Sequence, residues 1–349
     1  MPGLKMENML FWLSRKINYP LVGPKVLQIS LTSRCNLNCR MCSITNSVPK
    51  DEELSTAQIL HAIDQAEGYG IKEILLTGGE PFLREDLFEI SGYCHSKGLR
   101  SIVTTNGTLI NEPMVESIVN SRISHLHFSI DGFKDANDYV RGPGVYDKII
   151  KAVNLLSEKR RKHHSFSLGL ACTVMDNNVD QLSGLVKLAD DLNIDVINFQ
   201  PLVKDNSNFL DKTLPMFWVK KENIAILSGE IRKIRDYKPR HITVYEEPRL
   251  ELLIEYYKGR LTRKDWTCFG GFKTAFICFS KGEPLIYTCH GICGNLNEVS
   301  LKKAWTSREA RKLRIHSKNC KNLCIQSCYS NEASSNFKNA LGWKNWKGQ

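Results

Sequence analysis

The segment VLQISLTSRCNLNCRMC, residues 26–42, joins a short strand-like run to a loop that carries three cysteines. Apolar and polar residues alternate over its first seven positions, as they do in a β-strand with one buried face. Cys35, Cys39 and Cys42 follow with the spacing C-x3-C-x2-C, at the carboxyl end of that strand. Loops at this end carry the chemistry in barrels of β-α units, so the segment points to a fold and a site together.

Similar short apolar runs alternate with amphipathic stretches over the first two hundred residues. This alternation predicts successive β-α units and a parallel sheet. Six strands make most of a β-α barrel but leave it two units short of eight, so we expect a partial (β/α)6 TIM-like barrel that is open at one side. The predicted strands are residues 26–32, 71–77, 99–104, 123–130, 167–174 and 194–200, and the predicted helices are 56–69 (with Ser55 as N-cap), 86–97, 112–120, 146–159 and 179–192.

The strand at residues 123–130 indicates what fills this barrel. Its apolar residues share one face and its polar residues share the other. Helices cover the outside of such a barrel, so the polar face is expected to look inward. A polar interior suits a polar ligand, although it could also be a core that satisfies its own hydrogen bonds. The residues predicted to face inward are Gln28, Ser30, Thr32, His125, His127, Ser129, Asp131, Asn198 and Gln200.

The composition is that of an ordinary folded protein, with 42% hydrophobic and 24% charged residues among 349. Disordered and collagen-like chains are therefore excluded. No apolar run approaches the roughly 18 residues that a membrane span needs, and the run at residues 9–13 is too short for a signal peptide. We expect a cytoplasmic protein, in which thiols stay reduced, so the twelve cysteines call for an explanation other than disulfides.

The net charge of +11 is concentrated near the carboxyl end, where residues 301–349 hold eleven Lys or Arg and two acidic residues. This segment is either a solvated basic face or a docking surface for an acidic partner. No interleaved aromatics and no DNA-reading helix accompany it, so we do not expect nucleic acid as a partner.

The sequence pattern changes near residues 240–250, from β-α alternation to closely spaced cysteines, glycines and turns. Residues 274–290 predict a hairpin about Lys281-Gly282, and residues 301–315 predict a helix. We therefore divide the chain into an N-terminal extension (1–25), the partial barrel (26–245) and a small cysteine-rich α+β domain (246–349).

Three thiolates on one short loop could bind zinc, but zinc normally takes a fourth ligand and no histidine lies nearby. An iron-sulfur cube held by three cysteines instead leaves one iron with open coordination. Here the sequence resembles the radical S-adenosylmethionine (SAM) superfamily, whose signature is C-x3-C-x2-C after the first barrel strand. Gly78-Gly79-Glu80-Pro81, after the second strand, resembles the GGEP motif of that family.

The resemblance implies a set of cofactor-binding residues. Gly78, Gly79 and Glu80 would meet the amino group of the methionine moiety. Arg141 and Ser129 would contact its carboxylate and the ribose, and a guanidinium suits a carboxylate because it can bind both oxygens. The further candidates are Met41, beside the adenine, Asn106, which could equally be a turn residue, and Val174.

The same resemblance implies a mechanism. An electron from a reduced 4Fe-4S cluster, delivered by a donor such as a flavodoxin or ferredoxin, would cleave S-adenosylmethionine. The resulting 5'-deoxyadenosyl radical would abstract a hydrogen atom from the substrate. The protein would position the reactants and exclude water, since the cofactor carries the difficult chemistry.

Seven cysteines between residues 268 and 328 resemble the SPASM and twitch extensions of some radical SAM enzymes, which hold auxiliary iron-sulfur clusters. Their order matches but their spacing does not, because the last three read C-x3-C-x3-C. We expect one auxiliary cluster, and a second cluster with an open iron is the alternative. The predicted ligands are Cys268, Cys289, Cys320 and Cys324, with Cys328 able to replace either of the last two. Cys278 and Cys293 could be ligands or buried thiols, and Cys94 and Cys172 are predicted core thiols.

The sequence leaves two classes of function open. One is a radical SAM enzyme that oxidises a polar substrate, a peptide side chain or a sugar or aminocyclitol, with an epimerase or a peptide maturase as alternatives within the class. Only about 25 residues precede the first strand, too few for a fused leader-peptide-binding domain. The other class is a zinc-stabilised nucleic-acid-binding protein, in which GGEP would have no role. No residue stands out as catalytic acid or base, and His127 is a candidate from its inward position alone.

Overall fold

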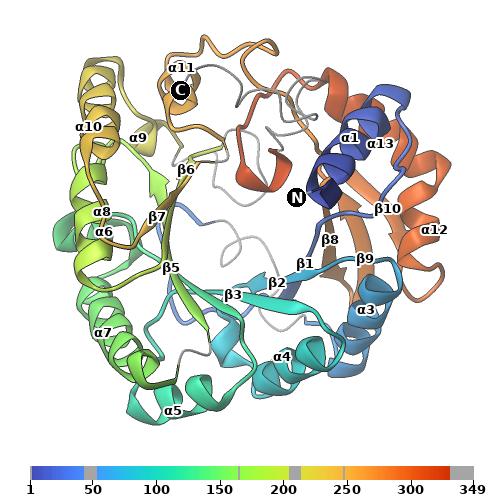
Figure 1. Cartoon of the computed structure of the whole chain (residues 1–349), viewed down its shortest axis with the longest axis horizontal. Helices are drawn as coiled ribbons and strands as arrows, with labels where there is room; N and C mark the ends of the chain where they lie inside the picture. The colour runs from blue at the N-terminus through green and yellow to red at the C-terminus, as the bar shows by residue number, and fades with distance from the viewer. Residues whose placement is uncertain (1, 43–52, 164–165, 204–213, 247, 331–349) are drawn as a thin grey trace.

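The computed structural model describes residues 2–42, 53–163, 166–203, 214–246 and 248–330. A sheet curls around a central space and helices cover its outside (Figure 1). The strands are β1 (Val26–Thr32), β2 (Glu73–Gly78), β3 (Arg100–Thr105), β4 (His125–Ser129), β5 (Ser167–Val174), β6 (Val196–Pro201), β7 (Thr243–Tyr245), β8 (Thr274–Ser280), β9 (Glu283–Thr288) and β10 (Gly291–Asn295).

The sheet order is β10-β9-β8-β1-β2-β3-β4-β5-β6-β7. All pairs from β8 through β1 to β7 are parallel, whereas β9 and β10 are antiparallel additions beyond β8. The predicted partial barrel is confirmed, but the parallel run is longer than the six strands expected. β7 extends one edge, and β8 from the carboxyl part of the chain pairs with β1 at the other.

Helices surround the sheet in the order that the β-α alternation predicts. Capping at the start of α3 is as expected, because the Ser55 side chain accepts from the Gln58 backbone N–H and the Gln58 side chain bonds back. The helices are α1 (Pro2–Ile17), α3 (Thr56–Gly68), α4 (Leu87–Ser96), α5 (Glu112–Asn120), α6 (Lys134–Arg141), α7 (Val145–His163), α8 (Leu182–Asp191), α9 (Leu214–Phe217), α10 (Ile224–Asp236), α11 (Glu251–Tyr257), α12 (Leu301–Thr306) and α13 (Arg308–Asn319).

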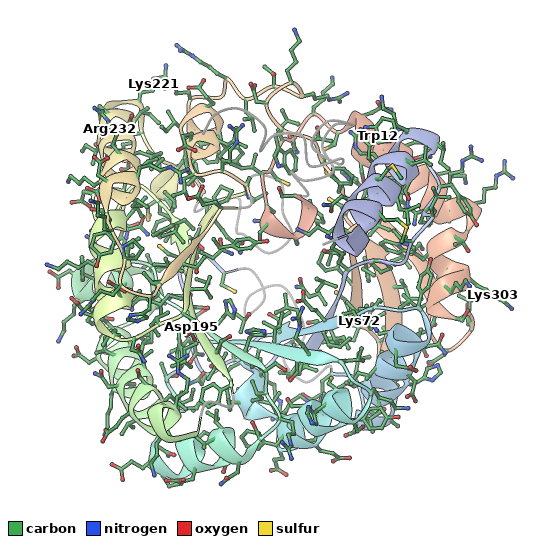
Figure 2. All side chains as sticks on the ribbon, in the orientation of Figure 1. Trp12, Lys72, Asp195, Lys221, Arg232 and Lys303 are labelled. Carbon is green, nitrogen blue, oxygen red and sulfur yellow. The ribbon has the colours of Figure 1, made fainter. Side chains whose placement is uncertain are left out.

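The main core lies between the sheet and this layer of helices. Leu126 and Phe128 of β4 are fully buried in it, as are Leu168 and Leu170 of β5. The polar residues between them therefore face the barrel interior, as their alternation predicts. Charged side chains such as Lys221, Arg232 and Lys303 point outward from the ring of helices (Figure 2).

The single helix predicted over residues 301–315 is wrong, because two helices occupy this region. Ser307 has an extended backbone (φ −64°, ψ 163°), ends α12 and accepts from the Ala310 N–H as the N-cap of α13. A serine at an N-cap competes well with helix continuation, which the apolar spacing alone does not reveal.

The N-terminal helix α1 packs on the carboxyl part of the chain. Phe11 forms a small buried cluster with Phe269 and Phe272, and the Arg15 Nε donates to the Cys268 carbonyl at 2.8 Å. One sheet runs across the boundary placed between residues 245 and 246, because β8 pairs with β1; the three-part division stays a prediction. No helix among the described residues is long and apolar enough to cross a membrane.

Candidate active site

The first three cysteines lie on a tight loop at the carboxyl end of β1. The Cys42 N–H donates to the Cys39 carbonyl at 3.0 Å, and the Arg40 N–H donates to the Val140 carbonyl at 2.8 Å. Cys39 is buried, while Cys35 and Cys42 are half-buried. Burial raises the pKa of the Cys39 thiol to about 11, the charge of nearby Arg141 lowers it, and Cys42 and Cys35 raise it further. The loop therefore holds the three thiols as mutual neighbours.

Gly78 and Gly79 lie directly against this cysteine loop. The Gly79 N–H donates to the Thr32 carbonyl at 2.7 Å. A Cβ on Gly79 would sit 2.1 Å from the Arg34 carbonyl oxygen, and a Cβ on Gly78, where φ is +130°, would sit 2.4 Å from that of Thr32. The close backbone approach that these two glycines permit is thus made to the segment that carries the cysteines.

Glu80 is fully buried next to the same loop. Its carboxylate accepts from the Thr105 hydroxyl at 2.7 Å and from the Asn106 and Phe82 N–H groups at 2.8 and 3.1 Å. Burial raises the pKa of Glu80, and these donors oppose the shift. A carboxylate has about four acceptor sites, so Glu80 joins the ends of β2 and β3 and keeps about one site for an ammonium group.

Asn106 connects the end of β3 to the cysteine loop. Its Nδ2 donates to the Asn36 side chain at 2.9 Å and lies 3.8 Å from the Cys35 sulfur. Its Oδ1 accepts from the Thr108 N–H at 2.9 Å, the ordinary contact of a turn residue. Asn106 therefore makes a turn contact and also contacts the cysteine loop, and its role toward the cofactor stays a prediction.

Arg141 ends α6 and forms a buried ion pair with Asp131, at 2.7 Å. Asp131 is fully buried, and its other oxygen accepts from the Thr173 N–H at 2.9 Å. The Arg141 Nε is buried and has no hydrogen-bond partner in the part of the chain that the structure describes. A buried guanidinium N–H without a partner, beside the cysteine loop, fits the carboxylate of a bound S-adenosylmethionine.

Met41 lies in a small apolar cluster that includes Val140 and Met175. Val174 is placed differently from its prediction, because its fully buried side chain belongs to the helix-facing core with Leu170. The structure thus brings the neighbouring Met175, and not the Val174 side chain, next to Met41. Ser129 is half-buried at the end of β4, on the inward face.

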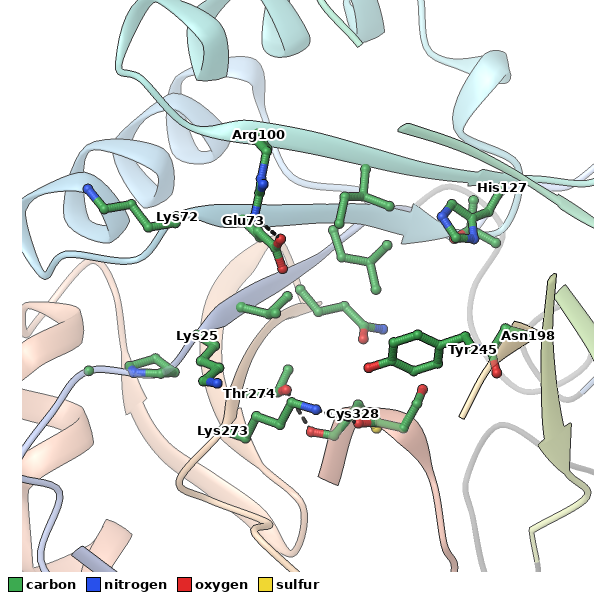
Figure 3. A pocket seen from close by; sticks show the side chains of 18 of the residues that line it. Lys25, Lys72, Glu73, Arg100, His127, Asn198, Tyr245, Lys273, Thr274 and Cys328 are labelled. Atoms are coloured by element: carbon green, nitrogen blue, oxygen red, sulfur yellow. Dashed lines mark hydrogen bonds and ion pairs between the residues drawn. The ribbon is translucent and has the colours of Figure 1, made fainter. Parts of the chain in front are cut away.

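A cavity of about 870 Å³ occupies the barrel interior and extends toward the amino ends of the strands (Figure 3). Its volume is in the range of ligand pockets, roughly 300–1,000 Å³. Gln28, Asn198 and Gln200 line it, as their inward alternation predicts, together with His127. The ring of His127 fits here because Gly169 lacks a Cβ, which would lie 2.9 Å from it. Burial, together with His125, lowers the pKa of His127 to about 4, so its ring is neutral near pH 7.

Charged side chains gather at the amino end of the cavity (Figure 3). Arg100 pairs with Glu73. Lys25 lies 3.8 Å from Glu7 of α1. Lys273 is buried, and its Nζ donates to the Ser327 carbonyl at 3.0 Å. With Lys72 the lining contains four lysine or arginine residues and two carboxylates, so it carries a net positive charge.

A second group of five cysteines lies at this end of the barrel, and one of them, Cys328, lines the cavity. Burial raises the pKa of the thiols of Cys268, Cys289, Cys324 and Cys328, and neighbouring thiols of the group raise it further. These cysteines come from separate segments around β8, β9 and the 310 turn Ser327–Tyr329. The group consists of Cys268, Cys289, Cys320, Cys324 and Cys328, the residues predicted to hold an auxiliary cluster.

The other cysteines stand apart from this group. Burial raises the pKa of Cys278 and of Cys293 to about 11, and no other cysteine contributes to either shift. Cys94 and Cys172 are buried in the main core, where they were predicted. Among the described residues, no three His, Cys, Asp or Glu side chains surround a single metal-ion position. Thiolates of a cubane cluster bind different irons and stand further apart than the ligands of one zinc ion.

Comparison with known proteins agrees with this geometry. Residues 29–182 match the family model of the radical SAM superfamily. This chain contains a radical SAM domain. The superfamily implies an enzyme with a 4Fe-4S cluster and S-adenosylmethionine as cofactors, and the match leaves the zinc-stabilised nucleic-acid-binding alternative without support.

Two relatives that carry different enzyme names are similar to the chain in sequence. An AdoMet-dependent heme synthase of Methanosarcina barkeri is 28% identical over 314 residues, which cover 84% of this chain and 85% of that protein. An Fe-coproporphyrin III synthase of the same organism is 33% identical over 176 residues, 50% of this chain. That second alignment spans only 43% of the relative's own length.

Solved radical SAM structures share the fold. SuiB of Streptococcus suis bound to S-adenosylmethionine has a TM-score of 0.67 and 17% identity, covering 90% of this chain and 73% of that one. SuiB has also been solved with its precursor peptide SuiA. Native anSMEcpe with bound AdoMet has a TM-score of 0.62 and 17% identity, covering 91% and 92%. At these identities the likeness concerns the fold alone.

Proposed function

We propose that this radical SAM enzyme oxidises a carboxylate-bearing substrate held in the barrel cavity, with a tetrapyrrole as the first substrate class to test. The observation that carries the proposal is the cavity itself, which reaches from the barrel interior to Cys328 of the five-cysteine group. A substrate in this space would lie between the two ends of the barrel where cysteines gather.

The loop Cys35, Cys39 and Cys42 would hold the radical-generating cluster, and Arg141 the carboxylate of S-adenosylmethionine. Bound there, these cofactors would supply the radical chemistry that removes one hydrogen atom from a substrate carbon. Oxidation then requires that one more electron and a proton leave the substrate. The five-cysteine group adjoins the cavity and has enough thiols for an auxiliary cluster that accepts this electron.

The charges around the cavity favour a carboxylate-bearing substrate over a neutral sugar. Lys25 and Lys273 lie at its amino end, and ammonium groups bind carboxylates through charge-assisted hydrogen bonds. The heme synthase that aligns over 85% of its own length makes a tetrapyrrole the natural first case, because heme itself carries carboxylates. A peptide is the second candidate, since SuiB is a structural neighbour solved with a peptide.

His127 is the candidate for a proton acceptor in the cavity. Its ring is neutral near pH 7 and lines the cavity. A neutral imidazole facing a substrate can accept the proton that leaves during oxidation. This assignment rests on the position of His127 in the cavity and on its neutral ring.

The test measures 5'-deoxyadenosine formed by anaerobically reconstituted protein with dithionite and S-adenosylmethionine. Fe-coproporphyrin III is expected to raise the yield above the substrate-free background and to be consumed. A rise with a cysteine-containing peptide and not with the porphyrin would replace the tetrapyrrole by a peptide substrate. Absence of deoxyadenosine under every condition, in protein that contains its iron, would contradict the radical chemistry itself.

A further inference from the structure

One cation of the cavity lining lies beside the five-cysteine group. Lys273 directly precedes β8, is 8% exposed and lines the cavity together with Ser327 and Cys328. Its Nζ donates to the carbonyl of Ser327, the residue before Cys328, at 3.0 Å. Thr274, the first residue of β8, donates from its hydroxyl to the Cys328 carbonyl at 2.7 Å. Two consecutive residues thus hold the turn that carries Cys328, and Lys273 places its ammonium there (Figure 3).

The charge of Lys273 acts on the Cys328 sulfur. Burial raises the pKa of the Cys328 thiol, neighbouring thiols of the group raise it further, and the charge of Lys273 lowers it. A cation that favours a thiolate also favours the reduced state of an iron-sulfur cluster bound to that thiolate, because reduction adds one negative charge. The effect is strong inside a protein, where little water screens the charge. Lys273 is therefore placed to raise the reduction potential of an auxiliary cluster at this group.

The same ammonium borders the space proposed for the substrate. The Lys25 N–H donates to the Lys273 carbonyl at 2.8 Å, so the two lysines are neighbours at the amino end of the cavity. The two carboxylates of the lining, Glu7 and Glu73, pair with cations other than Lys273. An ammonium has three N–H donors, so it can hold a substrate oxygen in addition to the backbone carbonyl that it already contacts. Lys273 can therefore contact a substrate carboxylate and the five-cysteine group at once.

We propose that Lys273 binds a carboxylate of the substrate and thereby couples substrate binding to the reduction potential of the auxiliary cluster. The inference rests on the proposed function, which supplies both the carboxylate and the cluster. A carboxylate on the ammonium offsets part of its charge, so binding should lower the reduction potential. Because coupling between two binding events is reciprocal, reduction should weaken carboxylate binding by the same factor.

This coupling assists release of the product. In the proposed oxidation, the substrate radical gives one electron to the oxidised auxiliary cluster and one proton to His127. The electron adds one negative charge beside Lys273. The ammonium is then shared between the bound carboxylate and the reduced cluster, so its hold on the carboxylate weakens after the oxidation and not before it.

The reduction potential of the auxiliary cluster tests the first half of the proposal. It is measured by electron paramagnetic resonance during a redox titration, in protein whose loop cysteines are replaced by alanine so that the loop cluster gives no signal. We expect Lys273→Gln to lower the equilibrium constant for one-electron reduction about tenfold, which corresponds to about 59 mV. Lys273→Arg keeps the charge and should keep the parent potential. An unchanged potential in Lys273→Gln, in protein that contains its iron, overturns the proposal.

The matched control is Lys72→Gln, which removes another cation of the same lining, across the cavity from Cys328 (Figure 3). We expect the potential of this variant to equal that of the parent. A shift as large as that of Lys273→Gln would mean that the net charge of the cavity sets the potential, and the specific role of Lys273 would be wrong.

Binding of metal-free coproporphyrin III to oxidised and to dithionite-reduced protein tests the second half. We expect the parent to bind it about tenfold more weakly when reduced, whereas the tetramethyl ester, which has no carboxylate charge, should bind both states equally. Lys273→Gln should remove the difference for coproporphyrin III. Should this variant fail to fold, the parent alone decides, because equal binding of coproporphyrin III to both of its states overturns the coupling.

These outcomes differ from a failure of the proposed function. If the parent binds coproporphyrin III in neither state and the iron porphyrin does not raise deoxyadenosine formation, the tetrapyrrole substrate is refuted, and this inference with it. If the porphyrin binds and is consumed, but neither the potential nor the binding depends on Lys273, the role of Lys273 alone is refuted.

Discussion

The two cysteine groups lie at opposite ends of the barrel strands and are built in different ways. Cys35, Cys39 and Cys42 come from one loop of eight residues after β1. The five-cysteine group is assembled from segments that precede β8, follow β9 and follow α13. One site is thus contained in local sequence, whereas the other exists only once the carboxyl part has folded against β1.

The groups also differ in whether a spare thiol could take the place of a lost cluster ligand. The loop has three thiols and no spare, so each is indispensable for a cluster held by three cysteines. The five-cysteine group has one thiol more than a four-ligand cluster needs. This difference predicts unequal consequences for the same cysteine-to-alanine change at the two ends.

The largest effect is expected at the loop. Replacing Cys35, Cys39 or Cys42 singly with alanine should reduce dithionite-driven deoxyadenosine formation to the level without protein, because no spare thiol lies on that loop. Activity is measured by chromatography of the quenched reaction. Cys94→Ala, a change at a core thiol outside both groups, is the control for general damage. Retained activity in any of the three loop variants would end the assignment of this site.

A smaller and graded effect is expected at the five-cysteine group. Cys289→Ala should lower the iron content by about four atoms per chain while deoxyadenosine formation continues without substrate. Cys328→Ala should retain most of this iron if the other four thiols are the ligands. Iron and acid-labile sulfide are measured on anaerobically reconstituted protein. Equal iron loss in both variants would show that Cys328 is itself a ligand.

The next effect concerns the buried ion pair between Asp131 and Arg141 near the cysteine loop. Asp131→Ala leaves the charge of Arg141 buried without its carboxylate, which should lower the free energy of unfolding by about 3–5 kcal/mol. Denaturant titration of the reconstituted protein measures it. Lys134→Ala removes the exposed Lys134–Asp147 pair and should cost less than about 1 kcal/mol. Similar costs for the buried and the exposed pair would contradict the role given to Asp131.

The difference between the groups also explains what the sequence could and could not predict. Local patterns located six strands to within about two residues and identified the loop of three cysteines. They did not reveal that β8 pairs with β1, because alternation along a strand says nothing of its neighbour. The resemblance proposed the five-cysteine group, and only the fold separates it from Cys278 and Cys293.

Differences between prediction and structure at single residues have equally local causes. Val174 is the last residue of β5 and follows the strand's alternation into the helix-facing core. Met175 lies beyond the strand end, where that alternation no longer holds, and its side chain reaches Met41 instead. Asp131 and Arg141 both stand in motifs identified in the sequence, but the sequence alone does not show that they form an ion pair. Their approach depends on α6, which ends at Arg141.

The smallest effect concerns the cavity between the two ends. The pKa of His127 is lowered to about 4, below the ordinary value near 6.5, so the unfolded chain binds more protons than the folded one between these values. The contribution of His127 to the free energy of unfolding should therefore be fully present above pH 6.5. The free energy of unfolding should fall by about 1–3 kcal/mol as the pH drops toward 4. His127→Gln should reduce this slope in denaturant titrations between pH 4.5 and 7.5, whereas His95→Gln, on the exposed surface of α4, should leave it unchanged. A parent-like slope in His127→Gln would mean that the imidazole is not held neutral by the cavity, and its assignment as proton acceptor would lose its basis.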